Sequence, residues 1–199
     1  MKNNMTALVS CFARYYHTVN SNIKIYNDTL APAILTKLEI ENISKNMMKG
    51  IKFFNPYYDE DDSLKWVVNN ILAPSILARS IFNEKHLLNE IRLGLKQYLI
   101  LESGYDTSRY KISDKVSVYE LDKKEIINQA LAKEAGEEMK SKYSYKDIEA
   151  IVQASNMLIY EHLNYQDIND TFFYDYNTLN PSNKILAPKR VAYCLLVKQ

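Results

Sequence analysis

Two uninterrupted apolar runs constrain the fold of this chain more than any other feature. They are "KQYLILE" at residues 96–102 and "KVSVYELD" at residues 115–122, and each ends in acidic residues. A continuous apolar run of this length is typical of a strand that is buried on both faces, as in a parallel sheet. Because helical patterns precede the first run and follow the second, the order of elements predicts an α/β fold.

Two further strands are predicted near the C-terminus, and helices fill most of the remaining chain. We expect the first two strands, Tyr98–Leu101 and Val116–Leu121, to pair in parallel. We expect the last two, Asn156–Leu163 and Val191–Val197, to pair antiparallel at one edge of the same sheet. Strand alternation predicts that this second pair buries Leu158, Tyr160, Ala192 or Tyr193, Leu195 and Val197.

Local signals give the starts and stops of the helices. Apolar residues at helical spacing predict an N-terminal helix that contains Leu8, Cys11 and Phe12. Ser63 is a candidate N-cap after four consecutive acids, Pro74 suits the first turn of the next helix, and Gly94 should end that helix. Further helices are predicted at residues 123–142, from a capping box at residues 144–147, and at residues 165–173.

The bulk composition limits the classes of partner. The 199 residues suit a single domain, which we divide into helices (1–93), the first two strands (94–142) and the C-terminal helix with its strand pair (143–199). With 25 basic and 24 acidic residues, the charge gives no indication of nucleic-acid binding. Two cysteines without metal-ligand spacing predict no metal site and a cytoplasmic protein, and the absence of a long apolar run predicts no membrane span.

The ends of the two central strands are the first candidate ligand site. Gly104 follows the first strand, and Glu120 and Asp122 end the second. In an open α/β sheet, ligands bind beyond the carboxyl ends of the strands, where a carboxylate can accept hydrogen bonds from ribose hydroxyls. The residues alone therefore suggest a nucleoside-containing cofactor. Gly104 could equally be an ordinary turn, and the two acids could simply end a strand or cap a helix.

Four motifs and the last third of the chain point to a family. They are "NMTALVSCFARYYH", "SILARSIFNEKHL", "LKQYLILESGYDTSRY" and "VYELD", followed by "YSYKDIEAIV" and the two C-terminal strands. In order and spacing the chain resembles the leucine carboxyl methyltransferase-like family of S-adenosylmethionine-dependent O-methyltransferases. The resemblance implies a Rossmann-like methyltransferase sheet with an N-terminal helical cap, the cofactor S-adenosyl-L-methionine, and a small-molecule methyl acceptor.

The resemblance also implies roles for individual residues. Arg79 matches the arginine that pairs with the methionyl carboxylate of the cofactor, whereas without the family match it would read as a surface ion-pair residue. Gly104 and Asp106 match the loop beside the cofactor. Asp122 matches the ribose-binding acid, with Glu120 two residues before it. Tyr16 and His17 end the first helix near the expected acceptor pocket, although a lone histidine is more often a cation at a helix C-terminus.

This sequence also departs from the family pattern. Glu102 stands where the family has a small residue, and Met5 stands where many relatives have a lysine that contacts the cofactor. Between Asp122 and Tyr143 the chain has room for about one helix, although the family would place about three βα units there, roughly 90 residues. The joint falls within residues 127–133. We therefore expect a shortened methyltransferase that acts on a small carboxylate or hydroxyl, or alternatively an inactive remnant that binds a partner.

Overall fold

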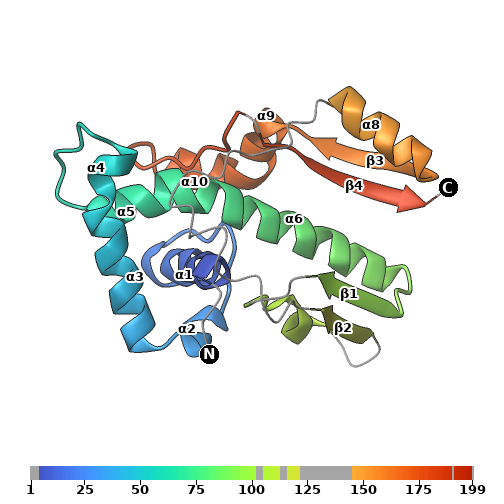
Figure 1. Cartoon of the computed structure of the whole chain (residues 1–199), viewed down its shortest axis with the longest axis horizontal. Coiled ribbons are helices and arrows are strands. Elements are labelled where there is room, and N and C mark those ends of the chain that lie inside the picture. Colours follow the sequence, from blue (N-terminus) through green and yellow to red (C-terminus); the bar gives the residue numbers. More distant parts are fainter. Residues whose placement is uncertain (1–4, 102–104, 113–115, 122–144, 190, 199) are drawn as a thin grey trace.

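The computed structural model describes residues 5–101, 105–112, 116–121, 145–189 and 191–198. One long helix, α6, runs across the middle of the molecule, with one strand pair on each side of it (Figure 1). The α-helices are α1 (Met5–Asn20), α2 (Ala31–Ile34), α3 (Lys37–Lys49), α4 (Ile51–Phe54), α5 (Ser63–Val67), α6 (Ala73–Arg92), α8 (Tyr145–Ala154), α9 (Tyr165–Ile168) and α10 (Tyr174–Leu179). The strands are β1 (Gln97–Leu101), β2 (Ser117–Leu121), β3 (Met157–Leu163) and β4 (Tyr193–Lys198).

The predicted parallel pairing of the two central strands is confirmed. β1 and β2 pair in parallel, in a register that places Gln97 opposite Ser117 and Leu101 opposite Leu121. The strands are not buried on both faces, however. Ile100 is buried, whereas Leu99 is 52% exposed and Tyr119, its partner in the register, is 50% exposed. The uninterrupted apolar runs therefore predicted the strands correctly and their burial wrongly, because no described element covers the face that carries Leu99.

The predicted antiparallel pairing of the last two strands is also confirmed, but the predicted buried face of β3 is wrong. Leu158 is 43% and Tyr160 is 75% exposed, while Met157, Ile159 and Glu161 are half-buried. A break in the register between Ile159 and Glu161 leaves Tyr160 without a partner on β4. In β4 the predicted residues Tyr193, Leu195 and Val197 are half-buried, and the expected alternation is seen only from Leu195 onward, because Cys194 is half-buried as well.

The two strand pairs form separate sheets, so the expected single sheet is not found among the described residues. Helix α6 occupies the space between them. On one side, Asn83 Nδ2 donates a hydrogen bond to Tyr98 Oη on β1 at 3.2 Å. On the other side, the rings of Phe82 and Tyr193 stack with their centroids 5.3 Å apart. The mixed α/β class is thus confirmed. Each described strand pair contacts α6, and the two pairs do not join into one sheet.

The helical run that ends in α6 contains a wider turn. α5 continues into the π-helical segment η1 (Val68–Leu72) and then into α6 without a break. Pro74 stands in the first turn of α6 as predicted, directly after the wider turn, and its missing N–H leaves one backbone hydrogen bond of the continuous helical run unmade. The N-cap of α5 is Asp62, whose Oδ1 accepts from Lys65 N at 3.0 Å, and not the predicted Ser63. Gly94 follows α6 with a φ of 100°, so the predicted helix stop is confirmed.

A similar arrangement occurs near the C-terminus, where the predicted helix at residues 165–173 is confirmed. α9 leads into the π-helical segment η3 (Asn169–Phe173) and then into α10. Asn164 is the N-cap of α9 and forms a capping box with Asp167. The helix predicted at residues 123–142 and the capping residue Ser144 lie outside the described residues.

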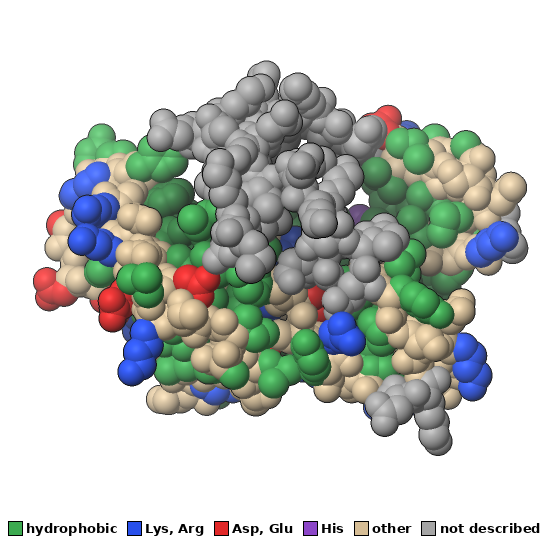
Figure 2. All heavy atoms as spheres, turned by 60° about the horizontal axis from the view of Figure 1, so that its bottom comes forward, with side chains coloured by type: hydrophobic (Ala, Val, Ile, Leu, Met, Phe, Trp, Pro, Cys, Tyr) green, Lys and Arg blue, Asp and Glu red, His purple; other side chains and the backbone are tan. Residues whose placement is uncertain are grey.

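One core joins the two ends of the chain. Side chains from α1, including Phe12, pack with Leu77 from α6 and with Phe173 and Ile185 from the C-terminal third. On the face shown in Figure 2, basic and acidic side chains are interspersed among hydrophobic and neutral ones. No described helix combines the length and apolar character that a membrane span requires.

Candidate functional site

The parallel pairing of β1 and β2 brings the two candidate loops to one edge of the sheet. Leu101 pairs with Leu121, so the chain leaves both strands at the same end. Glu120 pairs with Ile100 one step before this edge. Gly104, Asp122 and the departing residue Glu102 lie outside the described residues, as does the side chain of Glu120. The topology therefore meets the requirement for a shared site at the strand ends.

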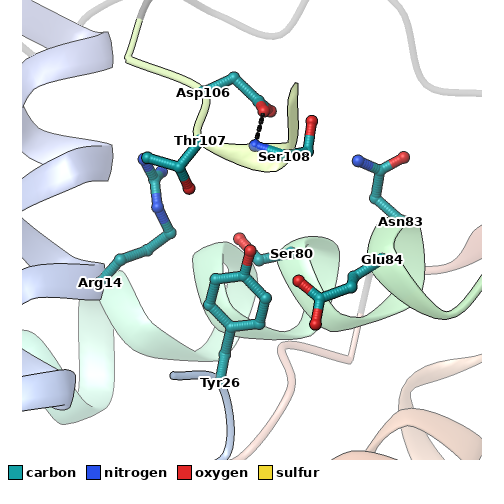
Figure 3. Close-up of a pocket in the computed structure, with 8 residues that line it drawn as sticks. All are labelled: Arg14, Tyr26, Ser80, Asn83, Glu84, Asp106, Thr107 and Ser108. Atoms are coloured by element: carbon teal, nitrogen blue, oxygen red, sulfur yellow. Dashed lines mark hydrogen bonds between the residues drawn. The ribbon is translucent and has the colours of Figure 1, made fainter. Parts of the chain in front are cut away.

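Asp106 is the one predicted loop acid whose side chain the structure describes. It is half-buried between β1 and the short 3₁₀ helix η2 (Ser108–Lys111). Its Oδ1 accepts a hydrogen bond from Ser108 N at 2.6 Å, so this oxygen orients the first turn of η2 (Figure 3). The carboxylate lines a small polar pocket that is partly open to solvent. The pocket is also lined by Arg14, Tyr26, Ser80, Asn83, Glu84, Thr107 and Ser108.

Arg79 lies on α6 next to this pocket but does not line it. Its neighbour Ser80 does, whereas Arg79 itself is exposed. Burial raises the pKa of Tyr193 on β4, and the Ser75 hydrogen bond and the charge of Arg79 both act in the opposite direction. The charge of Arg79 therefore acts on a side chain of β4.

The sequence interpretation missed a buried ion pair beneath the loop that carries Asp106. Arg14 Nε donates to Asp28 Oδ2 at 2.7 Å, and the two side chains are 9% and 0% exposed. Thr107 Oγ1 donates to the same oxygen at 2.9 Å. Arg14 Nη2 donates to the carbonyl oxygen of Tyr105 at 2.5 Å. Burial alone would raise the pKa of Asp28, but the hydrogen bonds from Arg14 and Thr107 outweigh it and lower that pKa.

The second oxygen of Asp28 holds the start of α2. Oδ1 accepts from Leu30 N and from Ala31 N, both at 3.2 Å. An aspartate three residues before the first residue of a helix is a sequence signal for this arrangement. Asp28 also donates its own N–H to Thr18 Oγ1 at 3.0 Å. One carboxylate thus joins α1, the start of α2 and the loop after β1.

A second ion pair anchors the far end of the loop. Lys111, the last residue of η2, forms a short ion pair with Glu84 on α6. Its Nζ also donates to Tyr26 Oη at 3.0 Å and lies 4.2 Å from the centre of the Tyr26 ring. Burial would lower the pKa of Lys111, but hydrogen bonds to Glu84 and Tyr26 raise it. The described part of the loop, residues 105–112, is therefore held at both ends.

His17 is a structural residue and not a cation at the end of α1. It is buried, its Nε2 accepts from Ile25 N at 2.9 Å, and its Nδ1 lies 3.0 Å from Ser21 Oγ. Since Nε2 accepts, the neutral ring carries its proton on Nδ1 and donates to Ser21. Burial, assisted by the charge of Lys24, lowers the pKa of His17 to about 4.

The two other residues named for the N-terminal helix also show no sign of a catalytic role. Burial, with smaller contributions from Asp62 and Tyr176, raises the pKa of Tyr16 to about 12, so its phenol stays protonated near neutral pH. Met5 is the first residue of α1 and is partly exposed. Neither side chain can act as a general base near pH 7.

Comparison with known proteins agrees with the motifs. The model of the family "Leucine carboxyl methyltransferase" matches residues 7–151. The chain is 26% identical over 279 residues to YktD of Bacillus subtilis (strain 168), a protein named as a candidate S-adenosyl-L-methionine-dependent methyltransferase; the alignment covers 86% of this chain and 92% of that relative. The alignment has 279 positions, which is more than the 199 residues of this chain. The relative therefore has residues within the alignment that have no counterpart in this chain, in agreement with the expectation of a shortened chain. The family match covers more than half of the chain, which therefore belongs to the leucine carboxyl methyltransferase family and is a methyltransferase, as its motifs predict.

Proposed function

We propose that this chain is an S-adenosyl-L-methionine-dependent O-methyltransferase that acts on a small carboxylate or hydroxyl acceptor. The structural observation that supports it most is the parallel pairing of β1 and β2, which brings the exits of both strands to one edge. Asp106 follows β1 at this edge, within the family's loop motif. The name of the Bacillus subtilis relative supports the same cofactor. Neither it nor the family match favours the alternative of an inactive binding protein.

The residues present fit the chemistry of this cofactor. Its amino-acid end carries an ammonium and a carboxylate, and its ribose carries two hydroxyls. Asp106 can accept from a cationic or hydroxyl donor, because its carboxylate is half-buried and lines an open pocket. The exposed guanidinium of Arg79 is accessible to a carboxylate. Gly104, Glu120 and Asp122 are proposed from the family motif for the turn beside the cofactor and for its ribose.

The proposed reaction makes modest demands on this chain. S-adenosylmethionine, when bound, supplies an activated methyl group on a sulfonium. The protein has to hold the acceptor in line with that group and exclude water, so positioning accounts for most of the catalysis. A carboxylate acceptor is already ionised near pH 7 and needs no general base. His17 is buried and the phenol of Tyr16 stays protonated near neutral pH. This favours an acceptor that needs no base from the N-terminal helix.

Calorimetry with S-adenosylmethionine and S-adenosylhomocysteine tests the cofactor assignment. Arg79→Ala and Asp122→Ala should each weaken binding by about ten- to a hundredfold, the loss expected for a hydrogen bond to a charged group. Glu102→Gly should strengthen binding, because it removes a carboxylate near that of the ligand. Arg92→Ala, at the far end of α6, is the matched control and should bind like the unaltered chain. No heat with the unaltered chain and no gain in Glu102→Gly would overturn the proposal.

The class of acceptor has a separate test. The protein is incubated with methyl-labelled S-adenosylmethionine and a small-molecule fraction of a cell extract, and the labelled product is then treated with mild alkali. A methyl ester releases methanol under these conditions, whereas a methyl ether does not. Labelled methanol would assign a carboxylate acceptor, and an alkali-stable label would assign a hydroxyl. Cofactor binding without any transferred label would favour the inactive binding protein.

A further inference from the structure

We propose that Thr107 and Asp28 are positioning residues for cofactor binding, because they fix the loop segment that presents Asp106. The inference rests on the proposed function, since it concerns the same loop. It assigns a role to two residues whose hydrogen bond acts through Asp106, and of the two only Thr107 is among the residues given above as lining the pocket.

A hydrogen bond from or to the Arg14–Asp28 pair lies on each side of Asp106. The residue before it, Tyr105, accepts a hydrogen bond from Arg14 through its carbonyl oxygen at 2.5 Å. The residue after it, Thr107, donates its hydroxyl to Asp28 at 2.9 Å and is 2% exposed. Arg14 and Asp28 are bonded to each other at 2.7 Å. One buried ion pair therefore holds the backbone on both sides of Asp106.

This arrangement holds the Asp106 side chain in one orientation, in which the carboxylate lines the pocket. The carboxylate is half-buried, and its Oδ1 is fixed by Ser108 N at 2.6 Å. Lys111 and Glu84 fix the loop again three residues beyond Ser108. The Thr107 hydroxyl is thus the described side-chain link between the middle of the loop and Asp28, and its removal should let Asp106 shift.

The charges of the network suit this role. Arg14 and Asp28 neutralise each other in the interior, as do Lys111 and Glu84 at the loop end. The loop is therefore fixed without adding net positive charge beneath a ligand that carries a cationic sulfonium. Asp106 keeps the negative charge that faces the pocket.

A set of three threonine variants tests the inference by calorimetry with S-adenosylhomocysteine. Thr107→Val keeps the shape of the side chain but removes the hydroxyl, and should weaken binding about tenfold. Thr107→Ser retains the hydroxyl and should bind within about twofold of the unaltered chain. Thr36→Val removes a different threonine hydroxyl, the N-cap of α3, and should lower the melting temperature without changing the dissociation constant.

The outcomes separate the inference from the proposed function. No heat with the unaltered chain would overturn both. If the unaltered chain binds and Thr107→Val binds equally well, the inference alone is wrong. If Thr107→Val does not fold, hydrogen exchange of the unaltered chain decides. S-adenosylhomocysteine should slow the amides of Leu30, Ala31 and Ser108 but not that of Glu39, and equal exchange with and without ligand would overturn the inference.

Discussion

The Nε atom of Arg14 lies 2.7 Å from Oδ2 of Asp28, and the two side chains are nearly excluded from solvent. This contact joins the first helix to the segment that starts α2, and through Thr107 it reaches the loop after β1. Because the same carboxylate accepts four hydrogen bonds, its loss disturbs three segments at once. Substitution of Asp28 therefore tests both the stability of this methyltransferase and its proposed site.

Asp28→Ala should lower the free energy of unfolding by about 3–5 kcal/mol, the cost of leaving a buried charge without its partner. Arg14 would keep its charge in the interior with the Tyr105 carbonyl as its remaining described partner. Urea denaturation followed by circular dichroism measures the change. The control is Asp59→Ala, an exposed acid in the loop before α5, which should change the free energy by no more than about 0.5 kcal/mol. Equal effects of the two substitutions would contradict the assigned role of the ion pair.

His17 should make the protein less stable as the pH falls from about 6.5 to about 4. The folded state holds the histidine neutral, with a pKa of about 4, whereas the unfolded chain binds the proton at its ordinary pKa of 6.5. Protonation therefore favours the unfolded state, and the loss reaches about 3 kcal/mol across this window.

Urea denaturation at several pH values between 4.5 and 7 measures this dependence. His17→Gln, whose amide oxygen can accept from Ile25 N, should show a smaller slope in this window. An unchanged slope in His17→Gln would show that other groups govern the pH dependence.

Gly94→Ala should destabilise the protein by about 1–2 kcal/mol. Gly94 has a φ of 100°, and an added Cβ would meet nothing within 4 Å, so the cost is backbone strain alone. Gly50 is the matched control, because its φ is −79° and alanine can adopt that conformation. Its nearest contact would be the backbone oxygen of Asn46 at 3.3 Å, which would have to move by a few tenths of an ångström. Thermal melting of both variants should show the larger loss for Gly94→Ala, and the reverse order would be inconsistent with the end of α6 described above.

Tyr193→Phe should lower stability by about 1 kcal/mol, because it removes the hydrogen bond from Tyr193 Oη to Ser75 O at 3.0 Å. The ring and its stack on Phe82 would remain. Tyr160→Phe, on the exposed face of β3, should have no measurable effect. Denaturation midpoints of the two variants provide the comparison. Equal midpoints would mean that the contact between β4 and α6 adds nothing through this hydroxyl.

The sequence by itself determined the secondary-structure elements that depend on interactions between neighbouring residues. The apolar runs predicted β1 and β2, and the glycine after α6 predicted its end, because periodicity and backbone freedom act over a few neighbouring residues. The continuous apolar character of the two runs predicted their parallel pairing, which the register confirms. The order and spacing of the motifs along the chain predicted the family, which the family match confirms.

Only the tertiary structure decided which side chains meet. Asp28 lies 14 residues from Arg14 and 79 from Thr107, and no periodic pattern connects positions so far apart. The buried face of β3 was predicted wrongly, because it depends on where α6 lies and on the break in register beside Tyr160. The division of the described strands into two sheets likewise follows from the placement of α6 between them. These features arise from long-range packing, whereas the sequence patterns report only the local conformational preferences of the chain.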